Sequence, residues 1–433
     1  MSLEKFTING RKELCGEVEI SGSKNSTVAI IPAVLMVEGI CNIENVPGIK
    51  DVRMLLEIIS KLGAKVEDCV DESNSVRIDA TNVNESVATF DMVKTLRASY
   101  YLLGALLGRF NKAQVSFPGG CDFGARPIDQ HIKGFEALGA KVEIEHGVIK
   151  VSAEKLVGTR IYLDVVSVGA TINLMLAACR AEGSTVIENP AKEPHVVDVA
   201  NFLNAMGAKI KGAGTDVIKI TGVERLTGGG AHGIIPDQIE AGTYMIAVAC
   251  TGGDVYVKNV IPKHMESLMA KLVEMNVKIE EGDDWIRVIS DRTLTKANIK
   301  TLPYPGFPTD MQPPATVLLC LAKGTSTITE GVWDSRFQYA EELKRMGANI
   351  KVEGRISVIE GTDKLSGTAV KATDLRAGAA LVLAGLVAEG KTDVYNLKYI
   401  DRGYEDFEKK LQALGADIKR VAITPEEFGV YVL

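Results

Sequence analysis

Hydrophobic and polar positions along the chain repeat in one pattern. An apolar helical stretch ends at Leu or Met, a small residue follows, and a polar residue and a β-branched residue then begin a strand. This signature occurs six times, at 62–66, 138–142, 206–210, 275–279, 346–350 and 414–418. Successive copies begin 76, 68, 69, 71 and 68 positions apart. Gly, or Asn276 in the fourth copy, stands just past each helix, as is usual at helix C-termini.

A second marker accompanies each signature. Short alternating strands are predicted at 41–46, 113–117, 184–189, 254–259, 326–330 and 392–396. The repeating unit is therefore helix, strand, helix, strand. Six such units predict an α/β fold of two lobes, each made of three repeats with helices packed on sheets.

The breaks between repeats predict where the lobes divide. The stretch 226–235 contains three consecutive glycines, and a second crossing is expected near residues 20–22. The expected lobes are 22–234 and 1–21 with 235–433. A cleft between two such lobes is a natural place for a ligand.

Composition narrows the class of protein. The chain has 433 residues, enough for two or three domains, and is 46% hydrophobic and 24% charged, as globular proteins are. A net charge of -7 argues against a nucleic-acid-coating surface but leaves room for a small cationic pocket. Seven scattered cysteines without a C-x-x-C pair fit a reducing compartment. No metal-binding motif, signal peptide or membrane-spanning run is recognised, so we expect a soluble cytoplasmic protein without a metal.

The glycine-rich stretch 118–129 holds the most distinctive chemistry. Cys121 follows two glycines, and Arg126 lies five residues later in front of a proline. Proline disfavours helix at Arg126, so its side chain is expected to project from a loop. Positive charge near a thiol favours the reactive thiolate. The alternative is a turn in which the cysteine is merely small.

Three polar segments are predicted to open apolar helices. Lys24, near a helix start, combines a cation with free backbone N–H groups, which suits an anion; the alternative is a helix cap with a solvated lysine. Arg97 suits a phosphate or carboxylate, or is a surface arginine. Ser167 and the N–H groups after it suit a phosphate, or form a plain N-cap.

Three further segments carry charge at turns in the second half of the chain. Asp310 is a candidate base or a helix cap. The segments 373–378 and 400–405 each place an Asp-Arg pair at a strand-to-helix turn, which suggests an anion clamp or structural ion pairs. Together the cations could gather around a multiply charged ligand. These cations are Lys24, Arg97, Arg126, Arg376 and Arg402.

In these residues the chain resembles the UDP-N-acetylglucosamine enolpyruvyl transferases, members of the enolpyruvyl transferase family, over nearly its full length. The segments that carry the resemblance are 21–25, 94–99, 118–129, 167–171, 307–312, 374–377 and 401–405. The shikimate-3-phosphate enolpyruvyl transferases share the six-unit fold but differ in the cysteine loop. The resemblance implies two inverse α/β lobes that close on UDP-N-acetylglucosamine and phosphoenolpyruvate, in the first committed step of peptidoglycan synthesis.

The resemblance also implies roles for individual residues. Lys24, Arg126 and Arg402 would bind phosphoenolpyruvate. Cys121 would be the general acid, able to hold a covalent phospholactoyl adduct and to react with fosfomycin, and Asp310 would be the base. The remaining expected substrate-binding residues are Asn25, Arg97, Pro127, Ile128, Asp129, Gln130, Ser167, Val168, Val332 and Arg376.

Departures from the family pattern and two other hypotheses complete the sequence picture. Val165 stands where some members carry lysine, and Gln130 is expected to touch the uridine through its backbone alone. The tail 421–433 runs past the sixth repeat. One alternative function is transfer to another acceptor such as shikimate 3-phosphate, and the other is a non-catalytic duplicate that binds UDP-sugars. The Cys121 loop argues against the first, and an intact acid and base argue against the second.

Overall fold

The computed structural model describes residues 4–69, 74–93, 97–117 and 128–423 of the chain. Its contacts divide the chain into two compact units. The continuous unit is Gly22–Ile235, and the split unit joins Met1–Ser21 to Pro236–Leu433. The chain therefore leaves the split unit after Ser21 and returns to it after Ile235.

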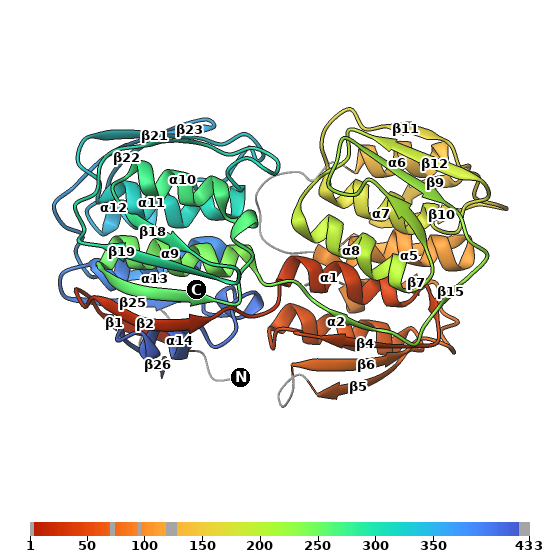
Figure 1. Ribbon diagram of the computed structural model, residues 1–433, viewed down its shortest axis with the longest axis horizontal. Coiled ribbons are helices and arrows are strands. Elements are labelled where there is room, and N and C mark those ends of the chain that lie inside the picture. Colours follow the sequence, from red (N-terminus) through yellow and green to blue (C-terminus); the bar gives the residue numbers. More distant parts are fainter. Residues whose placement is uncertain (1–3, 70–73, 94–96, 118–127, 424–433) are drawn as a thin grey trace. The chain divides into compact units, whose positions relative to one another are not determined.

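Within the described ranges, six four-stranded sheets share one topology, three in each unit (Figure 1). In each sheet the first pair of strands is parallel and the other two pairs are antiparallel. The continuous unit contains β16 (Ala231–Gly233), β4 (Ile40–Glu44), β6 (Ser75–Asp79) and β5 (Lys65–Cys69); β7 (Val87–Ala88), β8 (Lys112–Ser116), β10 (Val148–Ser152) and β9 (Lys141–Glu145); and β11 (Arg160–Tyr162), β12 (Ser184–Glu188), β14 (Val217–Thr221) and β13 (Lys209–Lys211). A further parallel pair joins β3 (Val37–Glu38) to β15 (Leu226–Thr227).

The split unit repeats this arrangement with strands from both ends of the chain. Its sheets are β2 (Leu14–Glu19), β17 (Gly253–Lys258), β19 (Trp285–Ser290) and β18 (Lys278–Glu281); β20 (Asn298–Lys300), β21 (Thr325–Thr329), β23 (Ile356–Glu360) and β22 (Asn349–Glu353); and β24 (Ala369–Lys371), β25 (Lys391–Tyr395), β1 (Glu4–Asn9) and β26 (Asp417–Ala422). The first two residues of the tail predicted to start at Val421 thus complete β26.

Each repeat signature ends a helix as predicted. These helices are α2 (Lys50–Lys61), α6 (Asp129–Ala137), α8 (Pro194–Ala205), α10 (Glu266–Glu274), α12 (Ala340–Arg345) and α14 (Phe407–Ala413). The Gly or Asn two positions after each helix has a positive φ, from 70° at Asn276 to 104° at Gly63. That conformation reverses the chain into the next strand and is open to glycine and asparagine at little cost.

A second set of helices is apolar on nearly every side. It comprises α1 (Lys24–Val34), α5 (Tyr101–Phe110) and α7 (Val168–Ala178) in the continuous unit, and α9 (Gln238–Thr251), α11 (Gln312–Cys320) and α13 (Leu375–Val387) in the split unit. A helix that is hydrophobic all round belongs in a core. Figure 1 shows α9, α11 and α13 inside the split unit, where they contact one another. Each unit has its own hydrophobic core.

The six strands expected after apolar helices are confirmed as β4, β8, β12, β17, β21 and β25. In four repeats the strand ends at an asparagine with positive φ. These are Asn45, Asn189, Asn259 and Asn396, and each donates its side-chain N–H to a backbone carbonyl near the neighbouring parallel strand. The second and fifth repeats lack this asparagine, and Cys121 and Val332 follow their strands.

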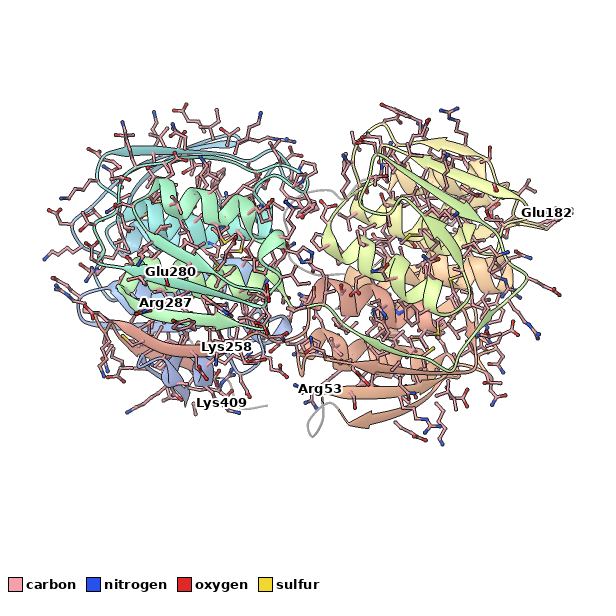
Figure 2. The ribbon with its side chains drawn as sticks, viewed as in Figure 1. Arg53, Glu182, Lys258, Glu280, Arg287 and Lys409 are labelled. Carbon is pink, nitrogen blue, oxygen red and sulfur yellow. The ribbon has the colours of Figure 1, made fainter. Side chains whose placement is uncertain are left out.

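Charged side chains pair across neighbouring strands on the sheet surfaces. Arg287 on β19 pairs with Asp254 on β17 at 2.7 Å and with Glu280 on β18 at 3.1 Å (Figure 2). Exposed pairs of this kind add little to stability, but they keep the sheet surfaces soluble. Among the described helices none combines the length and hydropathy that crossing a membrane requires.

Candidate active site

Lys24 is the first residue of α1 and is largely buried. Its ammonium lies 2.8 Å from the Oδ2 atom of Asp51, whose side chain is 3% exposed. Ser23 caps the helix, because its Oγ accepts the N–H of Ser26 at 3.3 Å. The alternative of a solvated lysine is therefore wrong. A buried carboxylate holds the Lys24 charge in place at the start of a core helix, and the charge is costly to leave unpaired.

Asp51 was missed by the sequence analysis. It is the second residue of α2 and lies 27 positions after Lys24 in the sequence. Nothing local distinguishes it from an ordinary acidic residue in the first turn of a helix, where carboxylates are common. A usable signal would have been its place on the helix face that also carries the buried Leu55 and Ile59.

Asp310 lies between two buried arginines of the split unit. Arg336 donates Nη2–H to Oδ1 at 3.1 Å, and Arg376 donates Nε–H to Oδ2 at 3.2 Å. The side chains of both arginines are 3% exposed, whereas that of Asp310 is 29% exposed. Asp310 forms part of a 3-10 turn, Thr309–Met311, in front of α11 and caps no helix, so the helix-cap alternative is wrong.

The electrostatics of this cluster favour an ionised carboxylate. Two guanidinium groups form charge-assisted hydrogen bonds with Asp310 and stabilise its proton-accepting form. Burial by itself lowers the pKa of Arg376, but Tyr404 and Asp310 raise it by more, so Arg376 stays charged. The Arg376 guanidinium also lies 5.3 Å from the centre of the Tyr404 ring.

Arg336 is a second residue that the sequence analysis missed. It lies in the loop after β21, close in sequence to Val332, whose side chain is 39% exposed. In that loop Glu330 accepts the backbone N–H groups of Val332 at 2.8 Å and Trp333 at 3.1 Å. The buried Glu330 therefore fixes the loop that delivers Arg336 to Asp310.

The two Asp-Arg turns have different structures. Asp374 caps α13 by accepting the N–H groups of Arg376 and Ala377 at 2.9 and 3.0 Å. Asp401 instead pairs with Arg420 of β26 at 2.7 Å, next to Arg402 in a 3-10 turn, Ile400–Arg402. One aspartate thus orders a helix start, and the other forms a structural ion pair.

Residues 128–130 begin α6 in the continuous unit. Ile128 stands at the N-cap and Asp129 is the first helical residue. The side chain of Gln130 is engaged with Asp164: its Oε1 accepts the Asp164 N–H at 2.9 Å, and its Nε2 donates to Oδ2 at 3.2 Å. The side chain of Gln130 is therefore engaged within the unit, and the expected contact of its backbone with the uridine stays a prediction.

Ser167 is the N-cap of α7, and its Oγ accepts the N–H of Ala170 at 3.3 Å. Val168 is the first helical residue, and Val165 is 57% exposed. The ring of His131 lies so close to Gly169 that a Cβ at that position would be 3.0 Å from Nε2. Burial lowers the pKa of His131 to about 4, so the imidazole is neutral beneath this turn.

Several predicted residues remain to be placed. Asn25 follows Lys24 in α1 and is half-buried. Arg97 is the first residue of a 3-10 turn, Arg97–Tyr100, before α5. Cys121, Arg126 and Pro127 lie outside the described residues.

The buried cysteines among the described residues are poor nucleophiles. Among the described residues, Cys41, Cys179, Cys250 and Cys320 are buried free thiols and Cys15 is exposed. Burial raises the pKa of Cys41, Cys179 and Cys320 to about 12, so they hold their protons at neutral pH. None of the described His, Cys, Asp and Glu side chains forms a group of three suited to a metal ion.

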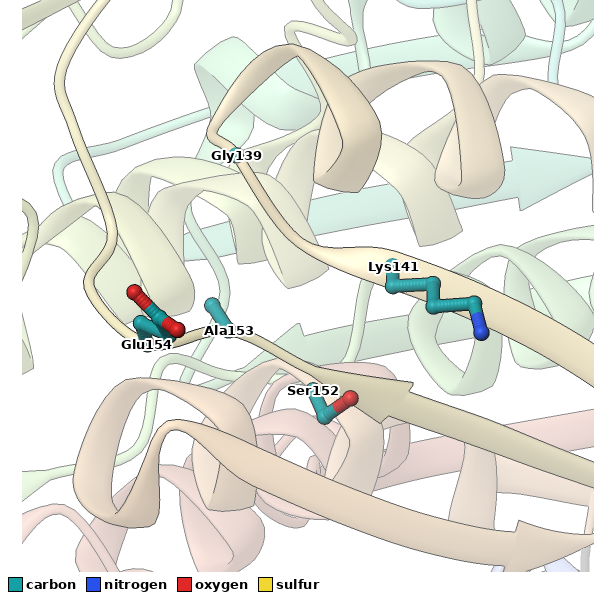
Figure 3. A pocket seen from close by; sticks show the side chains of 5 residues that line it. All are labelled: Gly139, Lys141, Ser152, Ala153 and Glu154. Atoms are coloured by element: carbon teal, nitrogen blue, oxygen red, sulfur yellow. The ribbon is translucent and has the colours of Figure 1, made fainter.

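An open depression of about 460 Å³ on the continuous unit lies apart from these residues (Figure 3). Gly139, Lys141, Ser152, Ala153 and Glu154 line it. Lys141 is paired with Glu143 at 2.5 Å, so its charge is already matched. The depression contains no predicted site residue and has no convergent set of polar groups that would define a binding site.

Comparison with known proteins identifies the class. The profile of the EPSP synthase (3-phosphoshikimate 1-carboxyvinyltransferase) family matches residues 8–411. The chain belongs to this family of enolpyruvyl transferases. Among solved structures it is similar to the enolpyruvyl transferase NikO from Streptomyces tendae, with a TM-score of 0.89 and 27% identity over 98% of this chain and 100% of that one. The fold of an Acinetobacter baumannii EPSP synthase matches with a TM-score of 0.74 at 20% identity, over 97% of this chain and 100% of that one. The predicted α/β fold of repeated units is confirmed.

The curated relatives indicate a narrower group within this family. The chain is 62% identical to UDP-N-acetylglucosamine 1-carboxyvinyltransferase 3 of Caldanaerobacter subterraneus subsp. tengcongensis, over 97% of this chain and 100% of that protein. It is 59% identical to UDP-N-acetylglucosamine 1-carboxyvinyltransferase of Clostridium botulinum, with the same coverage. The resemblance drawn from the sequence segments is confirmed.

Proposed function

We propose that this protein transfers the enolpyruvyl group of phosphoenolpyruvate to the 3-hydroxyl of UDP-N-acetylglucosamine and releases phosphate, the first committed step of peptidoglycan synthesis. The observation that carries the proposal is full-length identity of about 60% to UDP-N-acetylglucosamine 1-carboxyvinyltransferases. The position of Asp310 between Arg336 and Arg376 supports it, because the reaction needs a carboxylate base beside cationic groups.

The chemistry assigns a step to each group. Asp310 takes the proton of the sugar hydroxyl, whose oxygen bonds to C2 of phosphoenolpyruvate, while Cys121 gives a proton to C3. Loss of a proton from C3 and cleavage of the C2–O bond to phosphate then restore the double bond and release phosphate. General acid–base help of this kind typically contributes about 10²–10⁴-fold. No step calls for a metal or an organic cofactor.

Several residues share the binding of the two substrates. Lys24, Arg126 and Arg402 bind phosphoenolpyruvate, because its phosphate and carboxylate require several cations. The UDP-sugar is bound by the helix starts and loops described above. These residues are Asn25, Arg97, Pro127, Ile128, Asp129, Gln130, Ser167, Val168, Val332 and Arg376. We further propose that lobes 22–234 and 1–21 with 235–433 act as domains, and that the protein works in the cytoplasm, where its cysteines stay reduced.

The first experiment measures phosphate release from phosphoenolpyruvate with UDP-N-acetylglucosamine, and with each substrate omitted in turn. Release that needs both substrates is the expected result. Release with shikimate 3-phosphate in place of the UDP-sugar would assign the other acceptor. Binding of UDP-N-acetylglucosamine without any release would identify a non-catalytic duplicate.

The second experiment tests the acid. Cys121→Asp should keep turnover and resist fosfomycin, since a carboxylic acid gives a proton but forms no thioether. Cys15→Ser is the matched control, because Cys15 is exposed and should leave both turnover and inhibition unchanged. Full turnover by Cys121→Ala would exclude Cys121 as the acid.

A further inference from the structure

The proposed mechanism leaves one buried charged cluster of the split unit unused. It consists of Ser21, Glu240 of α9, Glu405, and Lys410 of α14, and we call it the Ser21 cluster. Lys410 donates to Oε1 of Glu240 and to Oγ of Ser21, both at 2.7 Å. Glu240 Oε2 accepts the backbone N–H of Ser21 at 2.9 Å, and Glu405 Oε2 accepts the Ser21 hydroxyl at 2.5 Å.

The cluster is costly to build. The side chain of Glu240 is 3% exposed and that of Lys410 is 19% exposed. Burial raises the pKa of Glu240, against the opposing effect of Lys410. Removing two charges from water costs most of the free energy that their attraction recovers. A buried ion pair therefore adds little to stability. The role of the cluster therefore lies in part in the positions of the residues that it holds.

One member of the cluster, Ser21, lies just before Lys24 in the sequence. Ser21 is held again through its carbonyl, which accepts the N–H of Asp237 at 3.0 Å. Gly22 has no room for a side chain, because a Cβ there would lie 1.7 Å from the carbonyl oxygen of Asn45. Ser23 donates its N–H to Ile235 at 2.7 Å and caps the helix that begins with Lys24. Ser21 is therefore held within the split unit, and Gly22 and Ser23, the two residues before Lys24, are held within the continuous unit.

Another member of the cluster, Glu405, lies just after Arg402 in the sequence. Glu405 comes three residues after Arg402, and Tyr404 between them is buried with its hydroxyl 2.9 Å from Thr243 Oγ1. Thr243 is one turn after Glu240 in α9, so the helix face that holds Ser21 and Lys410 also contacts Tyr404. The N–H groups of Gly403 and Tyr404 close onto Ile400, which leaves the turn little freedom.

We infer that Glu240 and Lys410 are positioning residues for phosphoenolpyruvate, holding the segment before Lys24 and the segment after Arg402 on one shared anchor, Ser21. The inference rests on the proposed function, in which Lys24 and Arg402 bind that substrate. Neither Glu240 nor Lys410 needs to touch it. Misplacing a binding cation by about 1 Å is enough to cost a large factor in rate.

The test is a double-mutant cycle of Glu240→Gln and Lys410→Met with steady-state kinetics. Each single variant should raise KM for phosphoenolpyruvate about tenfold, while the dissociation constant of UDP-N-acetylglucosamine changes less than about twofold. Lys410→Arg should recover part of the loss, because it restores a cation next to Glu240. Ser21→Ala, which removes only the hydroxyl, should raise KM about threefold and keeps the test valid if the charge variants fold poorly.

Two lysines provide matched controls. Lys409 is the neighbour of Lys410, is exposed, and pairs with Asp406 at 2.8 Å (Figure 2). Lys5 is a buried lysine of the same unit, 3.1 Å from Asp393, and joins β1 to β25. Lys409→Met should change nothing. Lys5→Met should lower the melting temperature without changing KM for phosphoenolpyruvate.

The outcomes separate the two claims. An active wild type with unchanged KM in folded Glu240→Gln, Lys410→Met and Ser21→Ala variants would overturn the positioning role. An equal rise in KM for Lys5→Met would also overturn it, since general destabilisation would then explain the effect. A wild type that releases no phosphate would refute the proposed function and this inference with it.

Discussion

The two units pair charged side chains in opposite ways at the starts of core helices. In the continuous unit one cation, Lys24, is held by one buried carboxylate, Asp51. In the split unit one carboxylate, Asp310, is held by two buried guanidinium groups, from Arg336 and Arg376. The first cluster places one carboxylate beside one cation, and the second places one carboxylate between two cations.

That difference indicates different tasks. In the first cluster the carboxylate orients the lysine. In the second, two guanidinium groups stabilise the charged form of the carboxylate between them and favour a substrate anion nearby. Repeats with the same fold therefore hold a cation in one unit and a carboxylate in the other. Substitutions at the Lys24 and Asp310 clusters test this difference.

The largest expected effect is at the carboxylate. Asp310→Asn keeps the shape of the side chain but removes the proton acceptor, so kcat should fall about 10²–10⁴-fold. Phosphate-release kinetics measure this. Asp393→Asn is the control, as Asp393 is a partly buried carboxylate paired with Lys5. A kcat for Asp310→Asn within about threefold of wild type would exclude Asp310 as the base.

The second effect separates stability from binding. Lys24→Met removes the cation that is paired with the buried Asp51, and the unfolding free energy should drop by about 3–5 kcal/mol. The double variant Lys24→Met/Asp51→Asn should recover most of that stability in denaturant titrations but should not recover activity. Recovery of both would reduce Lys24 to a structural role.

A third, smaller effect concerns the type of cation. Arg336→Lys keeps the charge but not the planar donor geometry, so kcat should fall about tenfold, with little change in the affinity for UDP-N-acetylglucosamine. The reverse swap, Lys24→Arg, tests the same point in the other unit. Equal activity of Arg336→Lys and wild type would show that charge alone matters at Asp310.

The smallest expected effect concerns the helix N-cap residues Ser23 and Asp374, which stand just before Lys24 and Arg376. Ser23 makes one cap hydrogen bond and Asp374 makes two with a charged acceptor. Ser23→Ala should lower the unfolding free energy by about 1 kcal/mol and Asp374→Ala by about 2 kcal/mol. Thermal melts of the two variants measure the difference, and a larger loss for Ser23→Ala would contradict it.

Local patterns made most of the fold predictable. The helix-ending Gly or Asn and the strand after it are set by nearby residues, and all six copies are confirmed. The Ser167 cap at α7 is local in the same sense. The partners of the charged residues are not local. Asp51 and Arg336 meet Lys24 and Asp310 only because separate helices and loops pack together, and no spacing in the sequence marks them.

The position of β1 also determines when the protein can finish folding. β1 lies between β25 and β26, with Phe6 opposite both Val394 and Arg420. During synthesis the continuous unit is complete once residue 235 has emerged, whereas β1 waits for β26, which lies about 400 residues after it and is reached about 20–80 s later at usual translation rates. A nascent chain therefore carries an unsatisfied strand at its leading end, the kind of edge that chaperones shield and that aggregation exploits.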